Sequence, residues 1–244
     1  MNRTLKIAFS LKNTYRVNTI LYSLKQIPLI KSILPQELYC DPDIKIFANI
    51  VSGIWEVIKA FLGKFLYFLL MITLVVSLYD NGSQREIFLH LFVLLTLIGA
   101  WVNTYIFNPT KDKYYALILL GMDAKEYALV TYGYELLKVL VAYLVFGLIF
   151  GSMRGLPVWQ CLMLPFAAAG TKITVVAYSL WDYERTGIAV NENQVGVMVW
   201  ILIGLGLAAA YGLPVLGWSI PEMVSVALLA WGILLGVMSM RKVW

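Results

Sequence analysis

The chain has 244 residues, of which 61% belong to the hydrophobic set AVILMFWYC and 14% are charged, and its mean hydropathy is +0.78. Soluble globular domains are about 45–50% apolar and about 25% charged, so this chain has too little charge to cover a water-facing surface. The composition excludes an ordinary soluble domain and predicts an integral membrane protein.

The reactive residues are few. Cys40 and Cys161 are the two cysteines, His90 is the single histidine, and the chain has no CxxC, HExxH or GxSxG motif. We therefore expect no disulfide scaffold, no metal site and no catalytic residue. Lys25 and Lys31 interrupt the first apolar stretch, and no small-residue cleavage site follows, so a secretory signal is not expected.

A basic segment, residues 1–60, is predicted to be cytoplasmic and interfacial. Residues 1–40 hold six basic residues and one acid, and Pro28 and Pro35 divide them. Asp41 or Asp43 is expected to cap a helix over 44–63. Its polar positions recur every three or four residues: Lys45, Asn49, Ser52, Glu56, Lys59 and Gly63. Such an amphipathic helix lies in the interface plane or packs on other spans, as a membrane anchor or as a docking surface.

Six stretches in residues 61–244 are apolar enough to cross a bilayer, which takes about 20 residues. They are Phe61–Tyr79, Ile87–Phe107, Tyr127–Gly151, Val158–Leu180, Val195–Tyr211 and Pro221–Met240. The predicted fold is an all-α membrane protein with six transmembrane helices behind an amphipathic N-terminal segment. Ala167 to Gly170, and Gly204, Gly206 and Ala208 to Ala210, are small enough for close helix contacts.

The connection between the second and third spans carries local folding signals. Asn108 is expected to cap a short helix that begins at Pro109, and Gly121 suits the left-handed residue that ends it. Asp123 then caps the next helix, with Glu126 three residues later as in a capping box. The short helix presents Lys111, Lys113, Tyr114, Tyr115 and Leu119. It is either a coupling element for a cytosolic partner or a plain helical hairpin.

Three ionisable residues lie within the spans, where charge is costly and often functional. Glu135 and Lys138 are three residues apart on the third span, and Lys172 lies in the fourth. We expect a structural ion pair, Glu135–Lys172 or Glu135–Lys138, with a substrate-lining role or snorkelling as the alternatives. His90 is expected to be a hydrogen-bonded interface residue.

An apolar, broken loop joins the fifth and sixth spans. Pro214 lies inside it, and Ser219 with Glu222 has the spacing of a capping box around Pro221. Such a loop is expected to dip into the outer leaflet as a re-entrant element, which requires protein or water around it.

Basic residues predict the orientation, because cytoplasmic loops are enriched in Lys and Arg. Fourteen of them precede the first span, lie between the second and third spans, or follow the fourth and sixth, whereas Arg85 and Arg154 fall on the other side. Both termini are therefore expected in the cytoplasm, as in a multi-pass plasma-membrane protein. The net charge of +5 is attributed to the basic residues that set the topology and attract lipid headgroups. It does not indicate nucleic-acid binding.

Residues Leu119 to Tyr127, LLGMDAKEY, resemble the entry into the third span of ABC-transporter permeases of the type-2 exporter class. Gly121 and Met122 depart from the pattern, since many relatives carry Pro there. The resemblance implies a permease subunit that forms half of an export pathway with a second copy or a homologous permease. It also implies that the helix at about Lys111 to Leu120 docks into a groove of a cytosolic ABC ATPase.

The chain has no G-x-x-x-x-G-K-[ST] loop, so ATP and magnesium are expected on the partner ATPase and no cofactor on this chain. The expected function is that of a non-enzymatic transport subunit coupled through residues 108–126. The alternative is a non-catalytic membrane scaffold or accessory subunit. An intramembrane enzyme is disfavoured, because it needs paired acids, a Ser–His pair or metal ligands within the spans.

Overall fold

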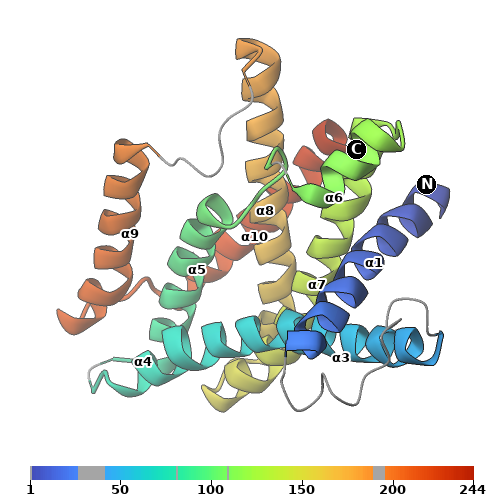
Figure 1. The fold of residues 1–244 in the computed structure, drawn as a ribbon. Helices are drawn as coiled ribbons and strands as arrows, with labels where there is room; N and C mark the ends of the chain where they lie inside the picture. The colour runs from blue at the N-terminus through green and yellow to red at the C-terminus, as the bar shows by residue number, and fades with distance from the viewer. Residues whose placement is uncertain (1, 27–41, 81, 109, 189–195) are drawn as a thin grey trace. The chain divides into compact units, whose positions relative to one another are not determined.

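A computed structural model describes residues 2–26, 42–80, 82–108, 110–188 and 196–244. Most of these residues are helical and none of them is in a strand (Figure 1). The helices are α1 (Asn2–Gln26), α3 (Pro42–Leu66), the π-helix η1 (Tyr67–Thr73), α4 (Leu74–Ser77), α5 (Gln84–Val102), α6 (Lys111–Tyr114), the π-helix η2 (Tyr115–Leu119), α7 (Ala124–Met153), α8 (Val158–Thr186), α9 (Val197–Val215) and α10 (Glu222–Val243). The predicted all-α fold class is confirmed.

Six helical segments are long and apolar enough to cross a membrane, as predicted. They are Ile46–Ser77, Gln84–Val102, Ala124–Met153, Val158–Thr186, Val197–Val215 and Glu222–Val243. At a rise of about 1.5 Å per residue, the two longest single helices, α7 and α8, exceed the bilayer core of about 30 Å. Both are therefore longer than an upright crossing requires.

The first span differs from the prediction of an interfacial helix followed by a separate span. The helix continues without a break from Pro42 through η1 to Ser77. No proline interrupts it after its first residue, and the destabilisation caused by the single glycine Gly63 is too small to end it. The amphipathic character predicted for residues 1–60 is concentrated in α3 and is weak in α1. The proposed caps Asp41 and Asp43 and the prolines Pro28 and Pro35 lie outside the residues or side chains that the structure describes.

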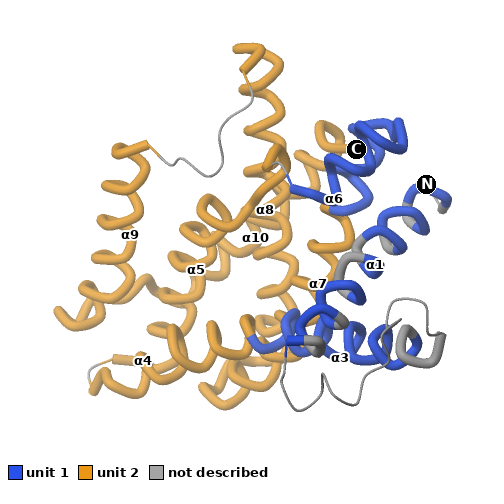
Figure 2. Tube along the Cα trace, in the orientation of Figure 1, with its two compact units in different colours: residues 1–62, 109–131 blue, residues 63–108, 132–244 orange. Residues whose placement is uncertain are grey.

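The chain divides into two compact units (Figure 2). Unit 1 comprises residues 1–62 and 109–131, and unit 2 comprises residues 63–108 and 132–244. The short helix between the second and third spans thus joins the unit of the N-terminal segment. In unit 1 the polar stripe of α3 is partly turned inward, since Ser52 is buried and Asn49 accepts a 2.6 Å hydrogen bond from Asn13 of α1.

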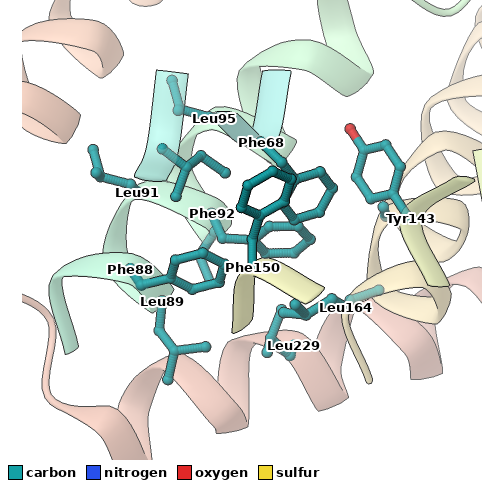
Figure 3. Close-up of a cluster of buried hydrophobic side chains, with 14 of the residues drawn as sticks. Phe68, Phe88, Leu89, Leu91, Phe92, Leu95, Tyr143, Phe150, Leu164 and Leu229 are labelled. Atoms are coloured by element: carbon teal, nitrogen blue, oxygen red, sulfur yellow. The ribbon is translucent and has the colours of Figure 1, made fainter. Parts of the chain in front are cut away.

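An aromatic cluster forms the centre of unit 2 (Figure 3). Phe68 of η1 is fully buried, and its ring centroid lies 5.2 Å from that of Tyr143, 5.9 Å from that of Phe92 and 6.1 Å from that of Phe150. These rings come from η1, α5 and α7. Ring pairs at these separations contribute about 0.5–1.5 kcal/mol beyond the area that they bury, so the cluster fixes how the three helices pack.

Helices α8 and α10 approach each other at glycines. A Cβ atom built on Gly170 would overlap the carbonyl oxygen of Gly232, and one built on Gly236 would overlap the backbone of Gly170. The small residues Ala167 to Gly170 are all buried, which confirms that this stretch is a helix contact. Their partner is a small-xxx-small pair, Gly232 and Gly236, of the kind that lets membrane helices pack backbone to backbone.

Candidate functional site

The predicted short helix between the second and third spans is present and begins later than predicted. Its N-cap is Thr110, whose side-chain oxygen accepts a 3.4 Å hydrogen bond from the Lys113 amide. The predicted cap, Asn108, therefore does not hold this position. Both are capping residues, but Thr110 has the extended backbone that a cap requires. The helix consists of α6 and η2, over Lys111–Leu119.

The turn after this helix has the predicted geometry. Gly121 has a φ of +59°, the left-handed conformation that glycine adopts without strain. The Met122 amide donates a 3.0 Å bond to the Ala116 carbonyl. Asp123 Oδ1 accepts a 2.7 Å bond from the Glu126 amide. The helix end and the start of α7 are therefore both hydrogen-bonded, so the short helix is held rigidly.

A small apolar core holds the short helix within unit 1. Ala116 is fully buried and packs with Ala8 of α1 and Tyr127 of α7, both buried too. Leu11, Leu117 and Met122 pack around them. One face of the short helix is thus anchored on α1 and on the first turn of α7.

The rest of the short helix exposes large apolar side chains, which we call the tip patch. It consists of Tyr114, Tyr115, Ile118 and Leu119 on the helix and of Leu120 directly after it. Ile118 is 66% exposed and Leu119 58%, and the rings of the two tyrosines pack edge to face, 5.8 Å apart. Lys111 is exposed beside the patch, and Lys113 is partly buried. Apolar clusters on water-facing elements commonly mark contacts with proteins or membranes.

The structure brings together three of the predicted tip residues and adds two. Tyr114, Tyr115 and Leu119 were among the residues that the predicted short helix presents, whereas Ile118 and Leu120 were not singled out. Helical spacing was the available signal, since Ile118 is four residues after Tyr114.

Of the two intramembrane pairs predicted, the structure forms one. Lys138 Nζ lies 2.6 Å from Glu135 Oε1. Lys172 does not pair with Glu135: its ammonium donates to the Asn103 carbonyl at 2.9 Å and to the Thr104 hydroxyl at 3.3 Å. Asn103 follows the last residue of α5, where carbonyls lack helical partners and carry partial negative charge. A helix end is therefore the partner that the sequence analysis missed.

This assignment predicts how mutations combine. Glu135→Gln and Lys138→Met are expected to be coupled by about 0.3–1 kcal/mol, as for a partly exposed ion pair, since the two side chains form one contact. Glu135→Gln and Lys172→Met are expected to be additive within about 0.5 kcal/mol. Unfolding of the single and double variants in detergent measures both couplings. Strong coupling to Lys172 together with none to Lys138 would reverse the assignment.

A polar network lies at the end of unit 2 where α7 is joined to α8, which we call the arginine end. Arg154, in the turn between α7 and α8, donates to Gln84 Oε1 at 2.5 Å, to the Thr73 carbonyl at 2.7 Å and to the Ser77 hydroxyl. Residues at the ends of η1, α4 and α5 thus share one guanidinium group.

Glu222 belongs to a second part of this network. Its Oε1 accepts a 2.6 Å bond from Gln160, and its Oε2 lies 3.5 Å from Arg85. The predicted capping box of Ser219 and Glu222 is therefore wrong: the N-cap of α10 is Pro221, without a side-chain cap bond. A carboxylate gains more from a cationic partner than from a single neutral amide.

The predicted re-entrant loop is reduced to a short turn, since α9 continues through Pro214 to Val215 and α10 begins at Glu222. Proline has no N–H to give to the carbonyl four residues earlier, which here belongs to Ala210. His90 Nε2 lies 3.2 Å from this carbonyl oxygen and 3.3 Å from that of Ala209, while Nδ1 accepts the Ile220 amide at 3.2 Å. Because Nδ1 accepts, the proton is assigned to Nε2. The buried His90 is hydrogen-bonded, as predicted.

Among the described residues, no group of three or more His, Cys, Asp or Glu side chains is arranged to hold a metal ion. Comparison of the chain with protein-family models, curated proteins and solved structures gave no match.

Proposed function

We propose that this chain is a transmembrane permease subunit of an ATP-driven exporter, coupled to a separate cytosolic ABC ATPase through the tip patch. The observation that carries the proposal is the tip patch itself. Four large apolar side chains on a short helix, and that of Leu120 directly after it, are exposed outside the six candidate spans. Exposing them to water is unfavourable by about 25 cal/mol per Å² of apolar surface, so a partner that covers them gains this free energy.

The rigid mounting of the tip patch supports a role in transmission. The helix is capped at Thr110, ended by Gly121 and packed through Ala116 on α1. The helix is separated from α7, a candidate span, by Leu120, Gly121 and Met122 and by the capping residue Asp123. A force applied to the tip patch therefore reaches a span through hydrogen-bonded backbone.

The partner follows from what the chain lacks and from how its charge is placed. The sequence has no phosphate-binding loop of the Walker type, so ATP hydrolysis is assigned to a second chain. In this proposal the tip patch and both termini lie in the cytoplasm and the arginine end lies outside. The many Lys and Arg side chains in 1–60 and 108–126 support this orientation. Two six-span units, identical or homologous, then enclose the pathway in the plasma membrane.

The experiment replaces Tyr114, Tyr115 and Leu119 together by alanine. Binding energy concentrates in a few buried anchors, so loss of these three is expected to weaken association with the ATPase by at least about 1 kcal/mol per anchor. Membrane insertion is expected to be unchanged, since all three lie outside the spans. Co-purification of the ATPase and its ATP hydrolysis are the measurements.

Tyr22→Ala is the matched control, because Tyr22 is an exposed tyrosine on α1 in the same unit. It is expected to leave both readouts unchanged. If the triple variant also retains full ATPase association and hydrolysis, the coupling role is rejected. If no ATPase accompanies even the unaltered chain, the scaffold alternative is favoured.

A further inference from the structure

We propose that a pocket between α5, α8 and α10 binds an uncharged molecule with two aromatic rings, which enters it from the bilayer. All three helices belong to unit 2 and are candidate spans. The pocket is separate from the tip patch, and the inference does not depend on the proposed export role.

The walls of the pocket are fixed by helix packing. Gly170 and Gly236 hold α8 and α10 backbone to backbone, and α5 contacts both helices (Figure 1). The inner wall includes Val93, Ala167 and Leu229, which are buried and belong to the core around the aromatic cluster. The pocket is therefore a hollow at the edge of a packed core, with one wall from each of the three helices.

The size of the pocket limits the molecule that fits. Its volume is about 270 Å³. An engineered apolar cavity of about 150 Å³ stays dry and binds benzene, a single ring, whereas sites for drug-sized ligands occupy about 300–1,000 Å³. A molecule with two rings lies between these limits.

The polar groups of the pocket already have partners. None of the described residues that line it is charged. Thr171 and Thr174 donate to carbonyls four residues earlier on α8, and the Thr96 hydroxyl lies 3.5 Å from that of Tyr67. A polar ligand would give up hydrogen bonds to water without replacing them here, which is unfavourable. The pocket therefore suits an uncharged, apolar molecule.

The aromatic side chains of the pocket favour a ring over an acyl chain. Each helix contributes one of them: Trp101 from α5, Tyr178 from α8 and Trp231 from α10. The rings of Trp101 and Tyr178 pack edge to face, 5.5 Å apart. Aromatic rings attract further rings in edge-to-face and offset arrangements, an attraction that a saturated chain lacks. All three side chains are exposed on spans, so the pocket opens toward the bilayer.

The test irradiates the full chain in phosphatidylcholine nanodiscs with benzophenone, an uncharged two-ring molecule that bonds to nearby C–H groups under light. Peptide mass spectrometry locates the label. We expect labelling of the pocket lining on α5, α8 and α10 to saturate as the benzophenone concentration rises. Excess naphthalene is expected to abolish this labelling, and excess decane to leave it unchanged.

Two results of this experiment would overturn the proposal without reference to any variant. Labelling that increases in proportion to benzophenone and never saturates would mean partition into the bilayer only. Competition by decane equal to that by naphthalene would assign the pocket to acyl chains and reject the aromatic ligand.

Variants that fill the pocket test its position. Thr174→Phe introduces a ring from α8 and Leu97→Trp one from α5, and both residues line the pocket. Each variant is expected to lose the saturable labelling while keeping the unfolding temperature of the unaltered chain. Because the two substitutions lie on different helices, a folding defect in one leaves the other as the test. Full labelling of a folded filling variant would overturn the site.

Two further substitutions on α8 are the matched controls. Thr174→Val keeps the shape of the side chain and removes only a hydroxyl that bonds its own helix. Ser179→Phe adds the same ring as Thr174→Phe at a position outside the pocket lining. Both are expected to retain the labelling. A loss in Ser179→Phe equal to that in Thr174→Phe would mean a general effect of the added ring and would overturn the proposal.

Discussion

Gly170→Ala is expected to lower the free energy of unfolding by about 3 kcal/mol or more, the upper range for overpacking a well-packed contact. The new methyl group would overlap the carbonyl oxygen of Gly232 on α10. Backbone atoms cannot rotate away as a side chain does, so α8 and α10 must separate along their whole contact. Thermal or denaturant unfolding of the purified chain in detergent measures the loss.

Gly204→Ala is the control for this substitution. Gly204 is also a glycine in a candidate span, but no atom lies within 4 Å of a Cβ built there. Alanine is favoured over glycine in helices by about 0.5–1 kcal/mol, so this variant is expected to match or exceed the unaltered chain. Similar stability of the Gly170 and Gly204 variants would contradict the close contact.

His90→Leu is expected to lower the free energy of unfolding by about 2–4 kcal/mol. Leucine removes the donor to the Ala210 carbonyl and the acceptor of the Ile220 amide, and each buried polar group left without a partner costs about 1–3 kcal/mol. Unfolding in detergent again provides the measurement.

A second substitution distinguishes this explanation from a simple packing defect. In the His90→Leu background, Pro214→Ala restores an N–H group four residues after Ala210, which can donate to the same carbonyl. We expect the double variant to recover about 1 kcal/mol, the net contribution of one hydrogen bond. If Pro214→Ala is as destabilising in the His90→Leu background as alone, or more so, then His90 does not compensate for the proline.

The elements that could be predicted are those set by nearby residues. Runs of about 20 apolar residues identify spans without knowledge of their neighbours. The turn at Gly121 and Asp123 was also predictable, because its bonds join residues within six positions of each other. The start of the short helix was misplaced only because two good capping residues, Asn108 and Thr110, flank Pro109.

The contacts that could not be predicted depend on the rotation of one helix against another. Lys172 was assigned a partner by its expected depth in the fourth span and Glu222 by sequence spacing, yet their partners are residues 62 to 137 positions away. The pair Gly232 and Gly236 was not singled out, since glycines are common in membrane helices and their importance appears only when α8 lies against them. The tip patch was predictable only in part. Its helix could be predicted from the sequence, but which face of the helix stays exposed depends on the packing of Ala116 against α1.

The polar network at the arginine end has a consequence for biogenesis. A chain emerges from the ribosome from its N-terminus onward, so the acceptors of Arg154, at Thr73, Ser77 and Gln84, are synthesised before it. Arg85 is instead synthesised before its partner, because Glu222 is the first residue of the last helix. The helices that carry the acceptors of Arg154 can therefore associate with α7 early. The ion pair of Arg85 forms only after α10 has been synthesised, so Glu222 completes the network.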